Sequence, residues 1–150
     1  MVSRILVPHD GTVMSDRALA KATEFAKALR AEIVIVHIVD SRFVPPSATL
    51  GFISDKTSLE GAKTELIRIL KSGSEQMLKQ KMEKVKAEGI GVDFILGVGS
   101  PADEIVKIAR DTNSDLIIMG SRQLHSGIGA LGSVARKVSE TADRPVMIIP

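Results

Sequence analysis

The segment Glu32–Val39, with the sequence EIVIVHIV, restricts the possible folds of this chain more than any other feature. It is almost continuously apolar and rich in β-branched residues, without the alternation of a strand that has one face in water. Strands of this kind are typical of a parallel sheet that helices cover on both faces. We therefore expect an α/β fold in which this segment is a buried strand that ends at Asp40.

Other apolar runs alternate with segments of helical periodicity. Apolar residues recur at helical spacing over Leu19–Leu29, and Thr12 or Ser15 is suited to cap that helix. Ser100 and Pro101 have the order typical of a helix start. The expected strands are Arg4–Pro8, Glu32–Val39, Val92–Val98, Asp115–Met119 and Pro145–Ile149, and the later expected helices are Leu59–Glu88, Pro101–Arg110 and Ser133–Ala142. This order predicts a mainly parallel sheet with right-handed crossovers and helices on both faces.

Two segments depart from this regular pattern. Residues Ser41–Ser58 include Pro45 and Pro46 and have no apolar period, so we expect a long irregular loop there. Loops of this kind inside compact domains commonly serve as lids or partner surfaces, or are disordered. Within the expected long helix, Ser72–Ser74 predicts a weak point or bend. The mixed charges of that helix are typical of a solvated face.

Composition limits the classes of protein to which the chain can belong. Its 150 residues, 44% of them apolar, are enough for one domain spanning residues 1–150. The net charge of +2 comes with no basic stripe, and the chain has four Phe but no Trp or Tyr, so we expect no nucleic-acid partner. The lack of cysteine excludes disulfides, thiol nucleophiles and cysteine-based metal sites. Without a signal peptide or a long apolar run, we expect a cytoplasmic protein with no membrane partner.

The stretch Gly127–Gly132 reads GIGALG and matches the G-x-G-x-x-G letters of a dinucleotide-binding fingerprint. That fingerprint belongs directly after a strand, with an acidic residue about 20 positions later. Here Gly127 lies 8 residues after Met119, and only 18 residues follow Gly132, so we expect no dinucleotide site. The chain also lacks the G-x-x-x-x-G-K-[ST] pattern of a Walker phosphate loop.

The two ends of this loop are better candidates for a phosphate site. Gly120 follows a strand, and Gly132 with Ser133 opens a helix, whose free N–H groups and partial positive charge attract phosphate. Alternatively, both glycines only permit turns and Ser133 only caps its helix. In a parallel sheet, ligands lie beyond the carboxyl ends of the strands. That rule places this loop on one rim with Pro8–Thr12, Ile38–Ser41 and Gly97–Pro101.

Five collinear parts of the chain resemble the universal stress protein family over essentially its whole length. They read ILVPHDGT, VHIVD, GSPADEIVKIA, SDLIIMGSR followed by GSVARKV, and RPVMII. The resemblance implies a three-layer α/β/α fold with a five-stranded parallel sheet in strand order 3-2-1-4-5, Rossmann-like and similar to the adenine nucleotide alpha hydrolases. It also implies a homodimer through the last strand, Pro145–Ile149, which fits the tendency of an apolar edge strand to pair with its twin. One branch of the family binds ATP at the strand ends, with Mg²⁺ accompanying the phosphates.

In that branch the loop after the fourth strand has the pattern G-2x-G-9x-G-[ST]. Counted from Gly120, Gln123 stands where the second glycine belongs, and eight residues, Leu124–Leu131, replace the expected nine before the last glycine. A missing glycine can block a backbone conformation or place a side chain among the phosphate oxygens. Gly127 and Gly129 add flexibility that could still let the loop close over phosphates.

The resemblance also assigns nucleotide contacts residue by residue. Asp10 would meet the adenosine moiety, and the backbone of Ile38 would read the adenine edge. Residues 120–122 would approach the ribose and phosphates, and residues 132–134 would hold the phosphates. The full set is Pro8, His9, Asp10, Ile38, Met119, Gly120, Ser121, Arg122, Gln123, Gly132, Ser133 and Val134. Alternatively, Asp10 only forms a turn with Gly11, and Ile38 is only a core residue.

The three histidines, His9, His37 and His125, are the remaining candidates for chemistry. His37 lies within an apolar strand, and we expect it to be a core residue. His9 and His125 could approach phosphates if both face the rim. No Ser-His-Asp set or group of carboxylates accompanies them, so we assign no catalytic or metal-binding residue and expect at most slow ATP hydrolysis.

Together these features predict a regulatory domain that binds ATP or a related adenine nucleotide. The nucleotide would change its conformation and its contacts with an unidentified protein partner. The first alternative is a dimeric interaction module of the same fold that binds no nucleotide, which Gln123 and the shortened loop favour. The second alternative is a slow ATPase or phosphatase that uses His9 or His125.

Overall fold

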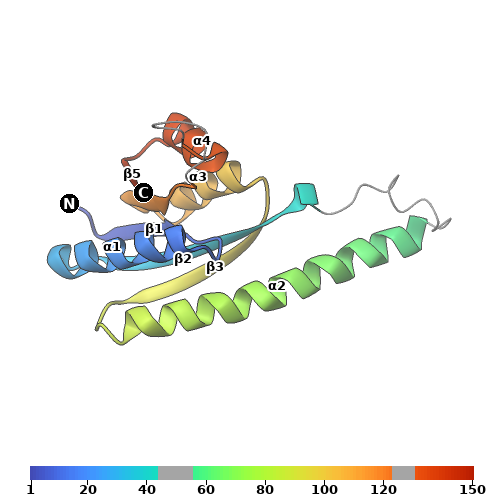
Figure 1. Ribbon diagram of the computed structural model, residues 1–150, viewed down its shortest axis with the longest axis horizontal. Coiled ribbons are helices and arrows are strands. Elements are labelled where there is room, and N and C mark those ends of the chain that lie inside the picture. The colour runs from blue at the N-terminus through green and yellow to red at the C-terminus, as the bar shows by residue number, and fades with distance from the viewer. Residues whose placement is uncertain (44–55, 123–130) are drawn as a thin grey trace.

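The structure, a computed structural model, describes residues 1–43, 56–122 and 131–150. Strands and helices alternate in the order expected from the sequence (Figure 1). The elements are β1 (Arg4–Pro8), α1 (Val13–Leu29), β2 (Glu32–Asp40), the short 3₁₀ helix η1 (Ser41–Phe43), α2 (Lys56–Lys86), β3 (Val92–Gly99), α3 (Pro101–Asp111), β4 (Leu116–Gly120), α4 (Ser133–Thr141) and β5 (Val146–Ile149). None of these helices is long and apolar enough to cross a membrane.

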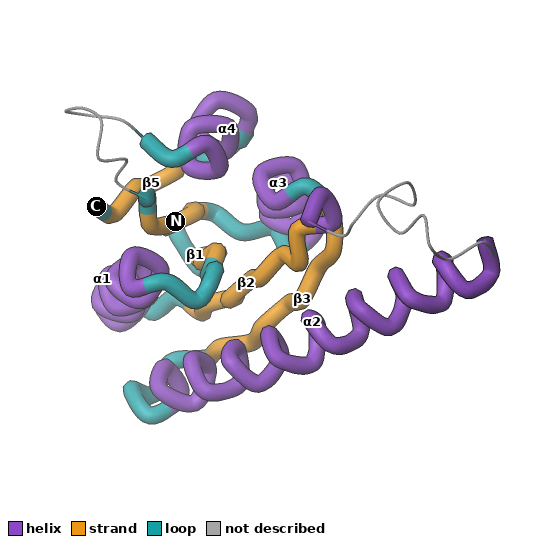
Figure 2. The backbone as a smooth tube through the Cα atoms, turned by 45° about the vertical axis from the view of Figure 1, so that its right-hand side comes forward, coloured by secondary structure: helices purple, strands orange, loops and turns teal. Residues whose placement is uncertain are grey.

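The five strands form one parallel sheet in the order β3-β2-β1-β4-β5, which confirms the expected strand order. Helices α1 and α2 cover one face, and α3 and α4 cover the other, as the three-layer prediction requires (Figure 2). β1 lies at the centre of the sheet, between β2 and β4. The chain leaves β1 toward one face and β4 toward the other, and that divergence opens a crevice at the carboxyl ends of the two strands.

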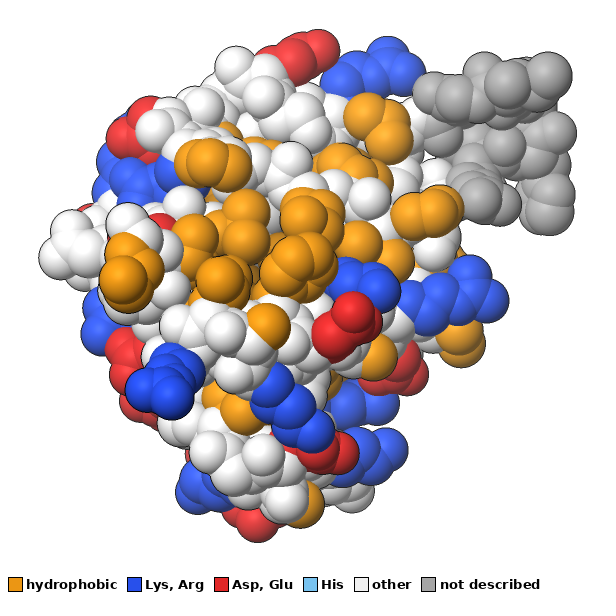
Figure 3. Space-filling model, turned by 90° about the vertical axis from the view of Figure 1, so that its left-hand side faces the viewer, with side chains coloured by type: hydrophobic (Ala, Val, Ile, Leu, Met, Phe, Trp, Pro, Cys, Tyr) orange, Lys and Arg blue, Asp and Glu red, His pale blue; other side chains and the backbone are white. Residues whose placement is uncertain are grey.

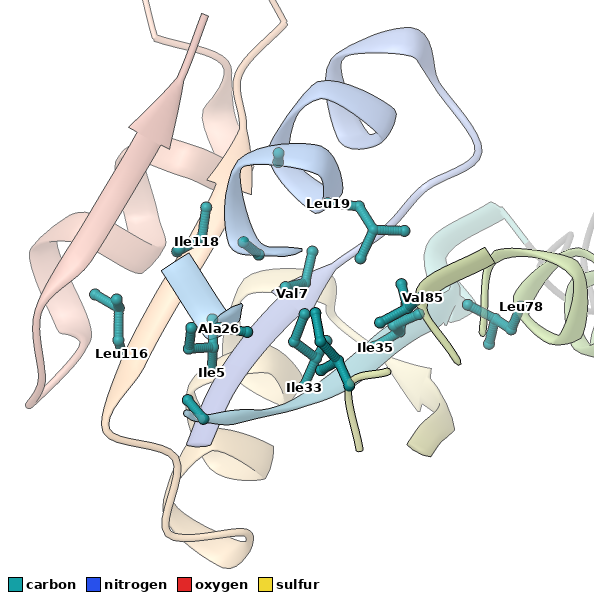
Figure 4. Close-up of a cluster of buried hydrophobic side chains, with 14 residues drawn as sticks. Ile5, Val7, Leu19, Ala26, Ile33, Ile35, Leu78, Val85, Leu116 and Ile118 are labelled. Atoms are coloured by element: carbon teal, nitrogen blue, oxygen red, sulfur yellow. The ribbon is translucent and has the colours of Figure 1, made fainter. Parts of the chain in front are cut away.

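The apolar run of β2 contributes to a separate core on each face of the sheet. Ile33 and Ile35 pack with side chains of α1 and α2 (Figure 4). Val34 and Val36 pack with side chains of α3 and α4. Neighbouring residues of a strand point to opposite faces, so both faces of β2 are apolar because both are covered. Burial of each such side chain contributes about 1.5–3 kcal/mol to folding.

α2 differs from the sequence prediction at its start. It begins at Lys56 and η1 occupies residues 41–43, so the expected irregular loop Ser41–Ser58 is wrong at both ends, and its middle lies outside the described residues. The helix continues through Ser72–Ser74, because a glycine at an exposed helix position costs only about 1 kcal/mol. Figures 1 and 2 show that the N-terminal part of α2 extends beyond the sheet.

Candidate functional site

A cleft of about 480 Å³ opens at the carboxyl ends of β1, β2 and β4, on the rim that the sequence predicts. Residues of α3, the start of α4 and α2 complete its walls. Ten of the twelve residues predicted to bind nucleotide line this cleft, namely Pro8, His9, Asp10, Ile38, Met119, Gly120, Arg122, Gly132, Ser133 and Val134. The buried Ser121 is not among the lining residues, and Gln123 lies outside the described residues.

Asp10 occupies a turn in which nearly every polar group is used. Its Oδ1 accepts hydrogen bonds from the Thr12 backbone N–H (3.1 Å), the Thr12 hydroxyl (2.5 Å) and the Ser15 hydroxyl (2.7 Å). The Asp10 N–H donates to the Ser15 Oγ at 3.2 Å, and Thr12 caps α1 by accepting from the Ser15 N–H. The turn-forming role considered for Asp10 is therefore present, and it requires only one of the two carboxylate oxygens.

The second carboxylate oxygen of Asp10 is directed toward the loop after β4. Its Oδ2 lies 3.4 Å from the Arg122 guanidinium, and the two side chains are 45% and 68% exposed, respectively. Burial raises the pKa of the Asp10 carboxyl, but the hydrogen bonds from Thr12 and Ser15, together with Arg122, lower it below its usual value. Asp10 is thus an ionised carboxylate that closes the turn with one oxygen and borders the cleft with the other.

His9 is buried, and both of its ring nitrogens contact protein groups. Its Nε2 lies 2.9 Å from Asp16 Oδ1, and its Nδ1 accepts the Gly11 N–H at 3.0 Å. Burial lowers the pKa of His9 by more than Asp16 raises it, so the ring is neutral near pH 7. With both nitrogens held in this way, the His9 ring offers no free nitrogen to a phosphate on the rim. His125, the other candidate, lies outside the described residues.

His37 is partly buried in β2 and connects that strand to β1. Its Nδ1 donates to the His9 carbonyl oxygen at 2.8 Å, because a carbonyl can only accept. It also lines the cleft, which sequence analysis did not predict. His37 is therefore not the core residue that was expected, because it is only partly buried and borders the site, although its ring does hold two strands together.

The start of α4 has no capping side chain. Gly132 occupies the N-cap position and Ser133 is the first helical residue, so the alternative in which Ser133 only caps the helix is wrong. The Gly132 N–H donates to the Ser121 Oγ at 3.2 Å, and the first helical hydrogen bond runs from the Arg136 N–H to the Gly132 carbonyl. Among the described residues, the N–H groups of residues 133–135 have no partner. The three residues that carry these donors line the cleft.

The two glycines that border the loop serve different purposes. A Cβ at Gly120 would lie 2.6 Å from the Met14 carbonyl oxygen, so the close approach of β4 to α1 requires a glycine there. At Gly132 the nearest described atoms would be 3.5 Å away, on Arg122, and the φ of −59° suits any residue. Neither packing nor backbone conformation in the described part of the chain requires a glycine at position 132.

Ile38 is a core residue that also lines the cleft. Its side chain is 9% exposed and belongs to the core beneath α3. Two residues earlier, the Val36 carbonyl accepts from the His9 N–H at 2.7 Å, at the last residue pair of β1 and β2. Alternate residues of a parallel strand direct their backbone groups to the same neighbour, so Ile38 faces the space beyond the end of β1.

The whole of residues 1–150 matches the model of the universal stress protein family. The chain belongs to this family. It is 31% identical over 154 residues to universal stress protein MJ0577 of Methanocaldococcus jannaschii, which covers 99% of this chain and 95% of the relative. Universal stress protein YxiE of Bacillus subtilis is 33% identical over 151 residues, with 99% of both chains covered. A solved structure of protein MJ0577 superposes with a TM-score of 0.84 at 29% identity, over 99% of this chain and 96% of that one.

This universal stress protein has further cleft residues that sequence analysis missed. Asp40 is the last residue of β2 and Arg42 lies in η1, where it donates to both Asp40 oxygens. The place of Asp40 on the predicted rim was a signal that could have identified it. Leu70 and Ser74 of α2 also line the cleft. No local pattern identifies these two, because α2 reaches the site only through the packing of the whole helix against the sheet.

Proposed function

We propose that the cleft binds ATP or a related adenine nucleotide. The observation that carries the proposal is the start of α4, where residues 133–135 line the cleft and their N–H groups lack partners among the described residues. Such a helix start attracts a phosphate through its free donors and its partial positive charge. Arg122 adds an exposed cation on the same wall.

The opposite part of the cleft is suited to a nucleoside. The backbone of Ile38 faces the cleft beyond the end of β1 and offers a donor and an acceptor to the edge of a base. Asp10 keeps one carboxylate oxygen for a ribose hydroxyl while its other oxygen holds the turn. A base near Ile38 and phosphates near Ser133 would therefore place the ribose beside Asp10.

Two solved universal stress proteins support an adenine nucleotide as the ligand. One is a complex with cAMP and the other, from Archaeoglobus fulgidus, a complex with dAMP, at 20% and 23% identity and TM-scores of 0.68 and 0.65. Within residues 1–43, 56–122 and 131–150, no group of three or more His, Asp or Glu could hold a metal ion. We therefore propose that Mg²⁺ arrives with the phosphates of ATP.

Mass spectrometry of protein purified without added nucleotide, followed by calorimetry with ATP, tests this proposal. We expect a co-purified adenine nucleotide or a measurable heat of ATP binding. Gly132→Ala should weaken binding, because its Cβ would contact Arg122 at 3.5 Å and restrict the approach of a phosphate to the start of α4. Gly61→Ala in α2 is the matched control, since no described atom outside its own helical turn lies within 4 Å of the added Cβ, and it should bind as the wild type does. Absence of both co-purified nucleotide and ATP heat would overturn the proposal.

The proposed role is regulatory, in the cytoplasm, with the nucleotide changing the conformation of the protein and its contacts with a protein partner.

A homodimer through β5 is part of the proposal. β5 is an edge strand with half-buried residues, and Figure 3 shows apolar side chains gathered on the side of the molecule where β5 lies. Pairing with a second copy would satisfy its free backbone groups. Light scattering should give the mass of two chains, and the mass of one chain would contradict this part.

Two alternatives make different predictions for the same experiments. An interaction module without nucleotide, favoured by Gln123 and the shortened loop, would form a dimer but give no ATP heat. A slow ATPase or phosphatase would turn over its substrate. His9 offers no free ring nitrogen to a phosphate, so that alternative depends on His125.

A further inference from the structure

His9 joins the cleft to the two helices on one face of the sheet. The residue is buried, with 2% of its surface exposed. The ring Nε2 lies 2.9 Å from the Asp16 carboxylate of α1. The same Asp16 oxygen lies 2.7 Å from the Lys81 ammonium of α2. The His9 main chain is also held, since its N–H donates to Val36 and its carbonyl accepts from His37. A continuous set of polar contacts therefore runs from Lys81 on α2, through Asp16 on α1, to His9 in the turn after β1.

The other ring nitrogen of His9 fixes the turn that contains Asp10. The Gly11 N–H donates to the His9 Nδ1 at 3.0 Å, and Gly11 has a φ of 84°, in the region that favours glycine. This contact spans Asp10, which lies between the two residues and borders the cleft. Nδ1 must be free of hydrogen to accept, so the ring is the neutral tautomer with its hydrogen on Nε2, directed at Asp16.

A protonated ring is incompatible with this geometry. The imidazolium carries a hydrogen on both nitrogens, so its Nδ1–H would point at the Gly11 N–H across 3.0 Å. Two donors cannot share a hydrogen bond, and the turn from His9 to Gly11 must then rearrange. Asp10 moves with it, because its own contacts to Thr12 and Ser15 depend on the same turn.

We propose that His9 is a positioning residue of the cleft, whose neutral ring holds Asp10 in place for nucleotide and whose protonation releases the turn and weakens binding. This inference rests on the proposed nucleotide-binding function. The charged or titratable groups that face His9 are Asp16 on α1, Lys81 on α2, Asp10 on its own turn and His37 on β2. Asp16 favours the imidazolium, whereas Lys81 opposes it directly and also neutralises Asp16.

The direction of the pH effect follows from the burial of the ring. Burial lowers the pKa of His9 from the usual value of 6.5. The neutral ring and its contact with Gly11 are therefore complete above about pH 6.5 and are lost as the pH falls through the lower, folded-state value. Between the lowered pKa of the folded state and the usual value of 6.5, the unfolded chain binds more protons than the folded chain. The free energy of unfolding therefore also falls as the pH decreases through this range.

Calorimetry with ATP from about pH 8 to about pH 5 tests this inference on three proteins. His9→Asn keeps an acceptor near the position of Nδ1 but does not titrate, and His9→Gln can reach Asp16 but lacks the acceptor for Gly11. We expect wild-type affinity to fall up to about tenfold more than that of His9→Asn over this range, since one hydrogen bond is lost. His9→Gln should bind more weakly at every pH. The phosphates of ATP titrate in the same range, but they affect wild type and His9→Asn equally.

A ligand-free measurement separates this inference from the proposed function. Nitrogen-15 NMR of the wild type should show Nδ1 without hydrogen at pH 7.5, and the Gly11 amide resonance should shift together with the titration of the His9 ring. If ATP fails to bind at every pH, the proposed function fails, and the spectra still decide whether His9 holds the turn. A Gly11 amide that does not respond to His9 titration, or equal pH dependence of wild type and His9→Asn, would overturn the inference.

Discussion

The two walls of the cleft at the centre of the sheet differ in how their polar groups are used. In the turn after β1, hydrogen bonds within the protein hold the Asp10 N–H, one Asp10 oxygen and both ring nitrogens of His9. At the start of α4, no side chain caps the helix, and the first N–H groups have no partner among the described residues. The polar groups of the β1 turn are thus largely satisfied within the protein, whereas the start of α4 has N–H donors without a partner among the described residues.

This difference suggests how the site would bind a nucleotide. A wall whose side chains are already fixed loses little conformational entropy when a ligand arrives, so it can define where the nucleoside lies. A helix start with free donors gains hydrogen bonds only when an anion arrives, so it can supply much of the affinity. Substitutions in the β1 turn should therefore affect stability first, and substitutions at α4 should affect binding first.

The two glycines give the largest expected contrast. Gly120→Ala places a Cβ 2.6 Å from the Met14 carbonyl oxygen and should lower the free energy of unfolding by about 1–3 kcal/mol. Gly132→Ala meets no atom closer than 3.5 Å and should cost less than about 1 kcal/mol, the loss expected when alanine replaces a glycine cap. Urea denaturation of both variants measures this. Equal losses of stability would show that the two glycines are not used differently.

A pair of serines tests the same contrast through hydrogen bonding. Ser15→Ala removes a buried hydroxyl that holds both the N–H and the carboxylate of Asp10, and it should destabilise the protein by about 1–3 kcal/mol. Ser133→Ala removes an exposed hydroxyl with no capping bond, so stability should change by less than about 0.5 kcal/mol. ATP affinity should fall about tenfold for Ser133→Ala if its hydroxyl contacts a phosphate. Urea denaturation measures the stability of both variants, and titration calorimetry measures their ATP affinity. A larger loss of stability for Ser133→Ala than for Ser15→Ala would contradict the proposed difference between the walls.

Arg122 should have the smallest effect on stability. Its side chain is 68% exposed, and its contact with Asp10 is 3.4 Å long, so Arg122→Gln should change the free energy of unfolding by less than about 0.5 kcal/mol. It should weaken ATP binding several-fold and make the affinity less dependent on salt, because one cation near the phosphates is lost. Arg110→Gln, which removes an exposed ion pair with Asp143 at the other end of α3, is the control and should leave affinity unchanged. If both variants weakened ATP binding equally, the loss would come from the lower net charge of the protein and not from the position of Arg122.

The architecture could be predicted from sequence because its signals are local. The apolar run of β2 requires two covered faces, and the alternation of strands and helices then leaves few topologies. Ten of the twelve expected site residues line the cleft, since the carboxyl ends of parallel strands meet on one rim.

The remaining features depend on contacts between distant segments. The sequence does not reveal that Met14 approaches Gly120, so a glycine required by packing resembled a glycine required by a ligand. Ser133 had the residue type of a cap, but Gly132 occupies the N-cap position and Ser133 is already the first helical residue of α4. The inward orientation of the His9 ring depends on Asp16 and on Lys81, which is 72 residues away in the chain.

The most direct test of the central claim is a crystal structure of the protein grown with ATP. We predict phosphate oxygens within hydrogen-bonding distance of the N–H groups of Ser133 and Val134, the ribose beside the free oxygen of Asp10, and the adenine at the backbone of Ile38. A structure with an empty cleft at saturating ATP would contradict the account, and so would ATP bound with its phosphates away from the start of α4.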